Sequence, residues 1–181
     1  MKIVILGWGS LIWNPGNLHI EGSWREDGPF LPIEFARVSG DRRLTLVLNL
    51  GSASVQTLWA LSAYRDLNQA RKNLRERERT SIDKVGYVSI PDNESNSQAI
   101  PQASDCIRKW ATEKELDAVI WTDLEANFSD KTKTELTTEN VIAYLNSLTK
   151  ESRDKAIEYI RNAPAQIDTI LRRRIIKAIE V

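Results

Sequence analysis

Short β-branched segments fill the first two thirds of this 181-residue chain, whereas longer helical patterns follow from Thr137 onward. Brief apolar runs closed by Gly, Pro, Asn or Asp are typical of strands. A chain in which the strands come first and the helices last favours an α+β fold. We therefore expect an α+β domain with a mixed, mainly antiparallel sheet or open barrel, flanking helices and a helical C-terminal tail. We place this domain at residues 1–130 and expect residues 131–181 to form a helical extension packed on it.

The individual elements follow from periodicity and from capping residues. Thr137 or Thr138 is expected to cap one tail helix, Ala163-Pro164 to end the next, and Asp168 to cap the last. Expected strands are residues 2–6, 34–38, 43–50, 54–63, 84–90 and 116–121; expected helices are residues 66–77, 103–112, 137–148, 150–162 and 169–179; and residues 8–32 and 92–98 should be loops.

The balanced net charge of the chain argues against nucleic acid as its partner. Lys plus Arg and Asp plus Glu both number 25, so the formal net charge is zero and gives no electrostatic reason to expect nucleic acid. We accordingly interpret Arg172-Arg173-Arg174 as a solvated helix face. The apolar run 3–6 is too short to span a bilayer and lacks a signal-peptide cleavage pattern, so no membrane partner is expected.

The chain has one cysteine, Cys106, and one histidine, His19. A single cysteine allows no internal disulfide, which favours a cytoplasmic location, and we expect Cys106 to be a small buried hydrophobic residue. A Cys/His zinc site needs several such ligands, so no metal is expected. Because His19 lies in a loop-like stretch without a motif, a carboxylate should carry the proton if the chain is an enzyme.

A glycine-rich turn, Gly7-Trp8-Gly9-Ser10, follows the first expected strand. A dinucleotide-binding fingerprint is disfavoured because Ile12 occupies the third glycine position and the following residues have turn chemistry where a helix should begin. Turns of this kind present consecutive backbone N–H groups that hold an anion such as a carboxylate. The alternative is a purely structural tight turn with Trp8 in the core.

The expected helix at residues 66–77 points one acidic side chain inward. Leu67, Ala70, Leu74 and Glu78 are three or four residues apart, so they share one stripe of the helix. Glu78 therefore continues the core-facing side. Two interpretations stay open: a structural pair with Arg42 or Arg43, or a carboxylate in a pocket whose pKa is raised by desolvation.

Together these two motifs resemble a known family. Residues 7–15, Gly-Trp-Gly-Ser-Leu-Ile-Trp-Asn-Pro, are similar to the Y-G-S-L-I-W-x-P signature of the ChaC branch of γ-glutamylcyclotransferase-like proteins. Residues 36–43 and 58–64 resemble the family's next strand and turn and its V-W-G-V-A-Y strand. Residues 74–78 resemble the L-D-x-R-E segment, which carries the catalytic glutamate at Glu78. The resemblance covers roughly residues 1–125.

The resemblance implies a cofactor-independent enzyme that releases 5-oxoproline from a small γ-glutamyl amide, with Glu78 as general acid and base. It implies that Gly7, Trp8, Gly9, Ser10 and Leu11 anchor the substrate, that Trp8 and Tyr87 wall the pocket, and that Arg37 neutralises an anionic group. A structural partnership of Arg37 with Asp41 or Glu34 is the alternative for that residue.

Three departures from the family pattern support a second interpretation. Trp8 stands where the family usually has tyrosine, Arg79-Thr80-Ser81 stands where glycines often follow the glutamate, and Tyr87 lies later than the usual tyrosine. The alternative function is a non-catalytic module on the same fold, which binds a small molecule or a protein. The tail could also serve interaction, including a homodimer, although its isoleucines are more simply explained by docking on the domain.

Overall fold

The first apolar run forms a central strand, β1 (Ile3–Gly7), that is buried along its whole length. The structure, a computed structural model, describes residues 1–179. In it β1 pairs antiparallel with β6 (Leu58–Ser62) and parallel with β9 (Ala118–Thr122). The other strands of this six-stranded sheet are β2 (Ile20–Arg25), β7 (Val85–Ser89) and β8 (Glu94–Asn96), in the order β2-β6-β1-β9-β7-β8.

Two helices explain why β1 is apolar at every position. Ile3 and Ile5 belong to a buried cluster with Ala70 and Leu74 of α1 (Leu67–Glu78). The alternate residues of β1 belong to a second cluster, which also contains Ile107 of α2 (Ala103–Glu113). A strand covered on both faces reads as a continuous hydrophobic run.

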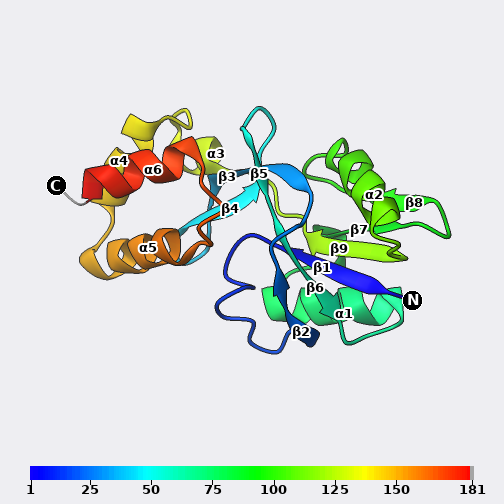
Figure 1. Cartoon of the computed structure of the whole chain (residues 1–181). Helices are drawn as coiled ribbons and strands as arrows, with labels where there is room; N and C mark the ends of the chain where they lie inside the picture. The colour runs from blue at the N-terminus through cyan, green and yellow to red at the C-terminus, as the bar shows by residue number, and fades with distance from the viewer. Residues whose placement is uncertain (180–181) are drawn as a thin grey trace.

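A three-stranded sheet lies beside the helical tail (Figure 1). Its order is β4-β3-β5, with β3 at Phe30–Val38, β4 at Leu44–Leu48 and β5 at Ser54–Gln56. The tail helices are α3 (Phe128–Thr132), α4 (Thr138–Ser147), α5 (Lys150–Asn162) and α6 (Ile170–Ile179), and a 3-10 turn, η1, covers Ile82–Lys84. The chain thus has the expected mixed α+β architecture with mainly antiparallel strands and flanking helices.

The tail helices bury their apolar faces against this sheet. Ile160, Ile167 and Ile175 are fully buried in the same cluster as Phe35 of β3 and Leu46 of β4. Ile170, in contrast, is 52% exposed. Docking therefore accounts for most of the tail's isoleucines.

Two short edge strands were wrongly expected to be loop. β2 is largely exposed, shifts register between Glu21 and Arg25, and contains Gly22 at φ 74°, so its sequence shows no alternation. β8 has three residues and pairs only with β7. Exposed edge strands carry a weak hydrophobic signal because neither face needs to be fully apolar.

The strand expected at residues 54–63 is divided at Thr57 between the two sheets. Thr57 donates from both its backbone N–H and its hydroxyl to the carbonyl of Pro29, at 3.1 and 2.8 Å. Its own carbonyl accepts from the N–H of Gly28 at 3.1 Å, where a Cβ on Gly28 would lie 2.5 Å from that oxygen. These contacts with a segment about thirty residues earlier break the strand.

Arg172 does not lie on a solvated face, contrary to the expectation from the arginine triplet. Its side chain is buried and its guanidinium donates to backbone carbonyls of the loop between α5 and α6, including Pro164 at 2.6 Å and Ile167 at 3.0 Å. Thr169 rather than Asp168 caps α6, because its hydroxyl accepts from the N–H of Arg172 at 3.1 Å. Asp168 instead pairs with Arg173 at 2.8 Å.

Cys106 also departs from its expected place, because it is exposed on α2 rather than buried. The core-facing side of α2 instead includes Ile107 and Trp110, which are three positions apart. Within residues 1–179, no helix is both long enough and apolar enough to cross a membrane.

Candidate active site

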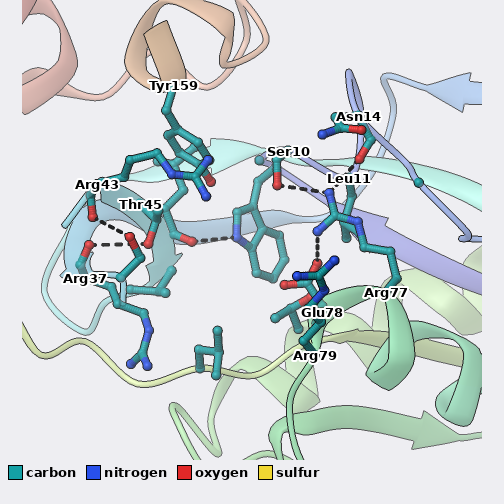
Figure 2. Close-up of a pocket in the computed structure, with 18 of the residues that line it drawn as sticks. Ser10, Leu11, Asn14, Arg37, Arg43, Thr45, Arg77, Glu78, Arg79 and Tyr159 are labelled. Carbon is teal, nitrogen blue, oxygen red and sulfur yellow. Dashed lines mark hydrogen bonds and ion pairs between the residues drawn. The ribbon is translucent and has the colours of Figure 1, made fainter. Parts of the chain in front are cut away.

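A pocket of about 780 Å³ lies where the turn after β1, the end of α1, the β3–β4 hairpin and α5 come together (Figure 2). Figure 2 shows Tyr159 and Arg43 on one side of it, and Arg77 and Glu78 on the other. The two sequence motifs therefore meet in one cavity. Such concave sites with a few convergent polar groups are the usual places for small ligands.

The turn after β1 lines the pocket with Trp8, Gly9, Ser10 and Leu11. Its shape is held by Ile12, whose N–H donates to the Gly9 carbonyl at 3.0 Å, and by Asn14, whose N–H donates to the Ser10 carbonyl at 2.8 Å. In the part of the chain that the structure describes, the backbone N–H groups of Gly9 and Leu11 have no protein acceptor. Unused donors in a glycine-rich turn suit an anionic ligand.

Trp8 connects this turn to the neighbouring three-stranded sheet. Its side chain is 5% exposed, and the indole N–H donates to the Leu46 carbonyl of β4 at 3.3 Å. The residue thus ties the turn to the three-stranded sheet and also walls the pocket. Burial of the ring with its N–H satisfied is the favourable arrangement for tryptophan.

Glu78 is the last residue of helix α1 and lines the pocket. Asp66 caps the start of the helix by accepting from the N–H of Gln69 at 2.9 Å, and Arg79 ends it in the left-handed region at φ 51°. Ala70 and Leu74 on the same stripe are buried, so the next position along it faces inward. The Glu78 side chain is accordingly only 15% exposed.

Burial raises the pKa of the Glu78 carboxyl above its ordinary value, and the neighbouring Arg77 guanidinium acts in the opposite direction. Arg77 Nη1 donates to Glu78 Oε1 at 2.8 Å. The structural pair of Glu78 is therefore with Arg77, not with Arg42 or Arg43. A carboxyl in a pocket whose pKa is shifted by burial and by a hydrogen-bonded cation is a candidate for proton transfer.

Arg77 also joins the two motifs. Its Nη2 donates to the Ser10 hydroxyl at 3.1 Å and to the Asn14 carbonyl at 2.6 Å. One guanidinium thus bridges the glycine-rich turn and the inward carboxylate. This bridge fixes the side chain of Glu78 relative to the turn without any covalent link.

Arg37 and Arg43 line the side of the pocket formed by the β3–β4 hairpin. Arg37 partners neither Asp41 nor Glu34, because its Nη1 donates to the Glu125 carbonyl at 2.7 Å. Asp41 pairs with Arg43 at 2.7 Å instead. With Arg77 and Arg79, these side chains give the pocket an excess of cations over carboxylates, which favours an anionic ligand.

Three residues considered from the sequence lie outside this pocket. Gly7 ends β1, where a Cβ would come 2.6 Å from the Trp24 ring. Tyr87 belongs to β7 and its ring lies 4.4 Å from the Arg71 guanidinium carbon, so it does not wall the cavity. His19 is hydrogen-bonded through Nδ1 to the Tyr64 hydroxyl at 2.9 Å.

Tyr159 of α5 is a pocket residue that the sequence did not indicate. It lines the cavity, although it belongs to the tail beyond the region of family resemblance. Its spacing to buried Ala156 and Ile160 marks a core-facing position, but helical spacing alone does not distinguish a core residue from a pocket residue.

Comparison with protein-family models, curated proteins and solved structures gives no match. Within residues 1–179, no group of three His, Cys, Asp or Glu side chains is placed to hold a metal ion.

Proposed function

We propose that this protein is a γ-glutamylcyclotransferase-like enzyme, on a fold of that kind, which releases 5-oxoproline from a γ-glutamyl amide. One observation carries the proposal: a buried carboxylate, Glu78, shares a pocket with a turn that offers unused N–H donors, and Arg77 bridges the two. That pocket holds both things the reaction needs, an anchor for the glutamyl carboxylate and a proton carrier.

The proposed reaction is an internal cyclisation. The substrate's α-amine attacks its own γ-carbonyl carbon, a new C–N bond forms, and the bond to the leaving amine breaks. Nucleophile and electrophile share one molecule, so holding the substrate in a folded conformation supplies much of the rate increase. The reaction consumes no water and needs no electron carrier.

Glu78 carries protons from the α-nitrogen to the leaving nitrogen in two successive transfers, because the α-ammonium group loses two protons in becoming the lactam N–H and the leaving nitrogen gains two in departing as an ammonium ion. As a carboxylate it takes a proton from the α-ammonium group, which frees the nitrogen lone pair. As a carboxylic acid it then gives that proton to the leaving nitrogen. Burial raises the pKa of Glu78 above its ordinary value, which makes the carboxylate a stronger base toward the α-ammonium group than an exposed carboxylate would be.

The glycine-rich turn anchors the common half of every γ-glutamyl substrate. The N–H groups of Gly9 and Leu11 hold the glutamyl carboxylate, and Arg77 places Glu78 beside it. Arg37 and Arg43 on the hairpin side add positive charge, which favours substrates with a further anionic group.

The test is 5-oxoproline release from glutathione, a γ-glutamyl amino acid and a γ-glutamyl amine. Wild type, Glu78→Gln and Glu34→Gln are compared. Glu34 is a matched control because it is also a buried carboxyl with a pKa raised by burial, but it lies outside this pocket. We expect release by wild type and Glu34→Gln, and loss in Glu78→Gln.

Absence of release from every compound by folded wild-type protein would contradict the proposal. A rise in melting temperature with a γ-glutamyl compound in that case would identify a non-catalytic binding module.

A further inference from the structure

Tyr159 is the only contribution of helix α5 to the pocket lining described within residues 1–179. Its ring is 7% exposed and packs edge-on against Trp13, with ring centroids 5.2 Å apart, and against Phe35 at 6.4 Å. Figure 2 shows the side chain descending from α5 toward the cavity. The ring is therefore held in one place by aromatic neighbours on two sides.

The hydroxyl of Tyr159 lies directly over the glycine-rich turn. A Cβ built on Gly9 would come 2.5 Å from the hydroxyl oxygen but 3.6 Å from the ring carbon that bears it. The oxygen thus occupies the space that any side chain at position 9 would need. Trp8, the neighbouring residue of the turn, has no hydroxyl of its own to offer a ligand.

We infer that the Tyr159 hydroxyl donates a hydrogen bond to the carboxylate of the γ-glutamyl ligand held by the Gly9-Ser10-Leu11 turn. This inference rests on the proposed function, since it assumes a γ-glutamyl ligand in this pocket. It assigns a binding role to the C-terminal helices, which complete the site rather than merely covering the sheet.

The protonation state of the phenol suits a donor. Burial, and to a lesser degree the charge of Glu78, raises the pKa of Tyr159 to about 12, although hydrogen bonding from the backbone of Leu46 and Ser10 acts in the opposite direction. The hydroxyl therefore keeps its proton at neutral pH. A neutral hydroxyl beside a glycine-rich turn adds a directed donor without adding another charge.

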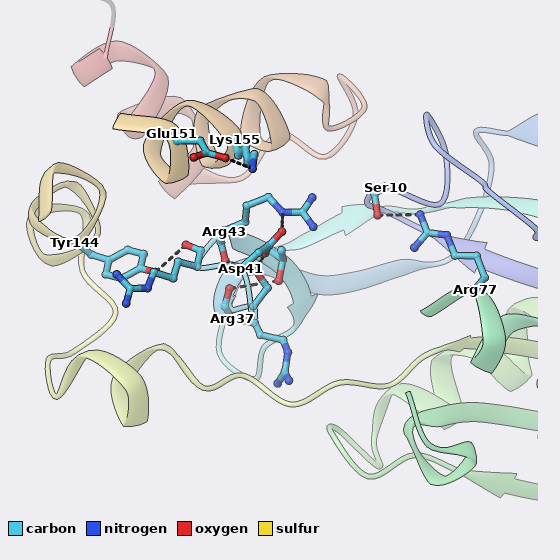
Figure 3. A network of polar contacts seen from close by, with 11 residues as sticks. Ser10, Arg37, Asp41, Arg43, Arg77, Tyr144, Glu151 and Lys155 are labelled. Carbon is cyan, nitrogen blue, oxygen red and sulfur yellow. Dashed lines mark hydrogen bonds and ion pairs between the residues drawn. The ribbon is translucent and has the colours of Figure 1, made fainter. Parts of the chain in front are cut away.

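The tail also fixes the wall opposite Glu78. The Tyr144 hydroxyl of α4 donates to the Arg42 carbonyl at 2.7 Å (Figure 3), and the Arg43 guanidinium carbon lies 5.5 Å from the Tyr159 ring centroid. The β3–β4 hairpin is thus held to the tail at two adjacent residues, Arg42 and Arg43.

The experiment measures calorimetric binding of L-5-oxoproline and of its carboxamide to wild type, Tyr159→Phe and Tyr64→Phe. Tyr64 lies outside the pocket lining and its hydroxyl is hydrogen-bonded to His19 Nδ1 at 2.9 Å, so it offers a matched tyrosine control. Phenylalanine keeps the ring packing and removes only the hydroxyl. Loss of a hydrogen bond to a charged group should weaken 5-oxoproline binding by Tyr159→Phe roughly 10-fold or more. Binding of the uncharged carboxamide should change much less, and Tyr64→Phe should bind both as wild type does.

Equal affinities of Tyr159→Phe and wild type for 5-oxoproline would overturn the inference, as would an absence of 5-oxoproline binding to wild type. An equal loss of affinity for the acid and the carboxamide would overturn it too, by pointing to altered packing. A protein that binds 5-oxoproline through Tyr159 but releases none from any γ-glutamyl compound would contradict the proposed function alone.

Discussion

Arg77 Nη1 lies 2.8 Å from Glu78 Oε1, and the two side chains are only 13% and 15% exposed. Adjacent residues of a helix point about 100° apart, so this pairing requires the guanidinium to fold back over the carboxylate. It does so while its other nitrogen contacts Ser10 and Asn14. Through Arg77, the pair connects the end of helix α1 to the turn after β1.

Removing Arg77 should change the pH dependence of the reaction. Arg77 holds the pKa of Glu78 below the value that burial alone would give. In Arg77→Gln that pKa rises, so the acidic limb of kcat/KM against pH should move to higher pH. Arg75→Gln is the control, because Arg75 pairs with exposed Glu76 at 3.3 Å. An unmoved limb in Arg77→Gln would disprove the coupling.

Glu78 should also affect stability as a function of pH. Its folded-state pKa is raised above 4.5, so the unfolded chain ionises first as pH rises. The stability of wild type relative to Glu78→Gln should therefore fall above pH 4.5 until the folded carboxyl ionises, with a slope of up to about 1.4 kcal/mol per pH unit. Urea midpoints at a series of pH values measure this; a difference that grows with pH would have the wrong sign.

The contact between Gly9 and Tyr159 predicts a suppressor pair. Gly9→Ala forces a methyl group to 2.5 Å from the hydroxyl oxygen, and overpacking of this kind costs about 1–3 kcal/mol. In Gly9→Ala/Tyr159→Phe the nearest ring carbon is at an ordinary 3.6 Å. The double variant should melt higher than Gly9→Ala alone. Simple addition of the two single effects would argue against the close approach.

The three consecutive arginines of α6 should differ strongly in how much their substitution lowers the free energy of unfolding. Arg172→Leu leaves carbonyls of the α5–α6 loop without their donor, which should cost about 2–4 kcal/mol. Arg173→Leu and Arg174→Leu change exposed positions and should cost less than about 0.5 kcal/mol. Chemical denaturation of the three variants tests this, and equal effects would contradict the buried role of Arg172.

Periodicity predicted the elements whose faces are wholly apolar or cleanly divided. The stripe from Leu67 to Glu78 correctly predicted both helix α1 and the inward direction of its last carboxylate, because three- and four-residue steps are local information. β1 and α5 were predicted from other local signals, a short β-branched run closed by Gly7 and a helical segment ended by Ala163-Pro164. The division of the strand at Thr57 was missed because its cause is the Gly28-Pro29 segment, distant in sequence.

The turn and the carboxylate of the pocket were predicted from the sequence, whereas the other lining residues depend on tertiary placement. The turn at Gly9 and the carboxylate at Glu78 carry local patterns. Tyr159 reaches the same cavity only because α5 docks on β4, and no local pattern distinguishes its position from a core position. Tyr87 was expected in the pocket only through the family resemblance, and the structure places it in β7 beside Arg71, outside the pocket lining.

The most direct test of the central claim compares kcat for 5-oxoproline release by wild type and Glu78→Gln at saturating substrate, with circular dichroism confirming that both are folded. We expect kcat to fall about 10²–10⁴-fold in Glu78→Gln with little change in KM, since the carboxyl moves a proton but does not anchor the substrate. Equal kcat values for the two folded proteins would contradict it.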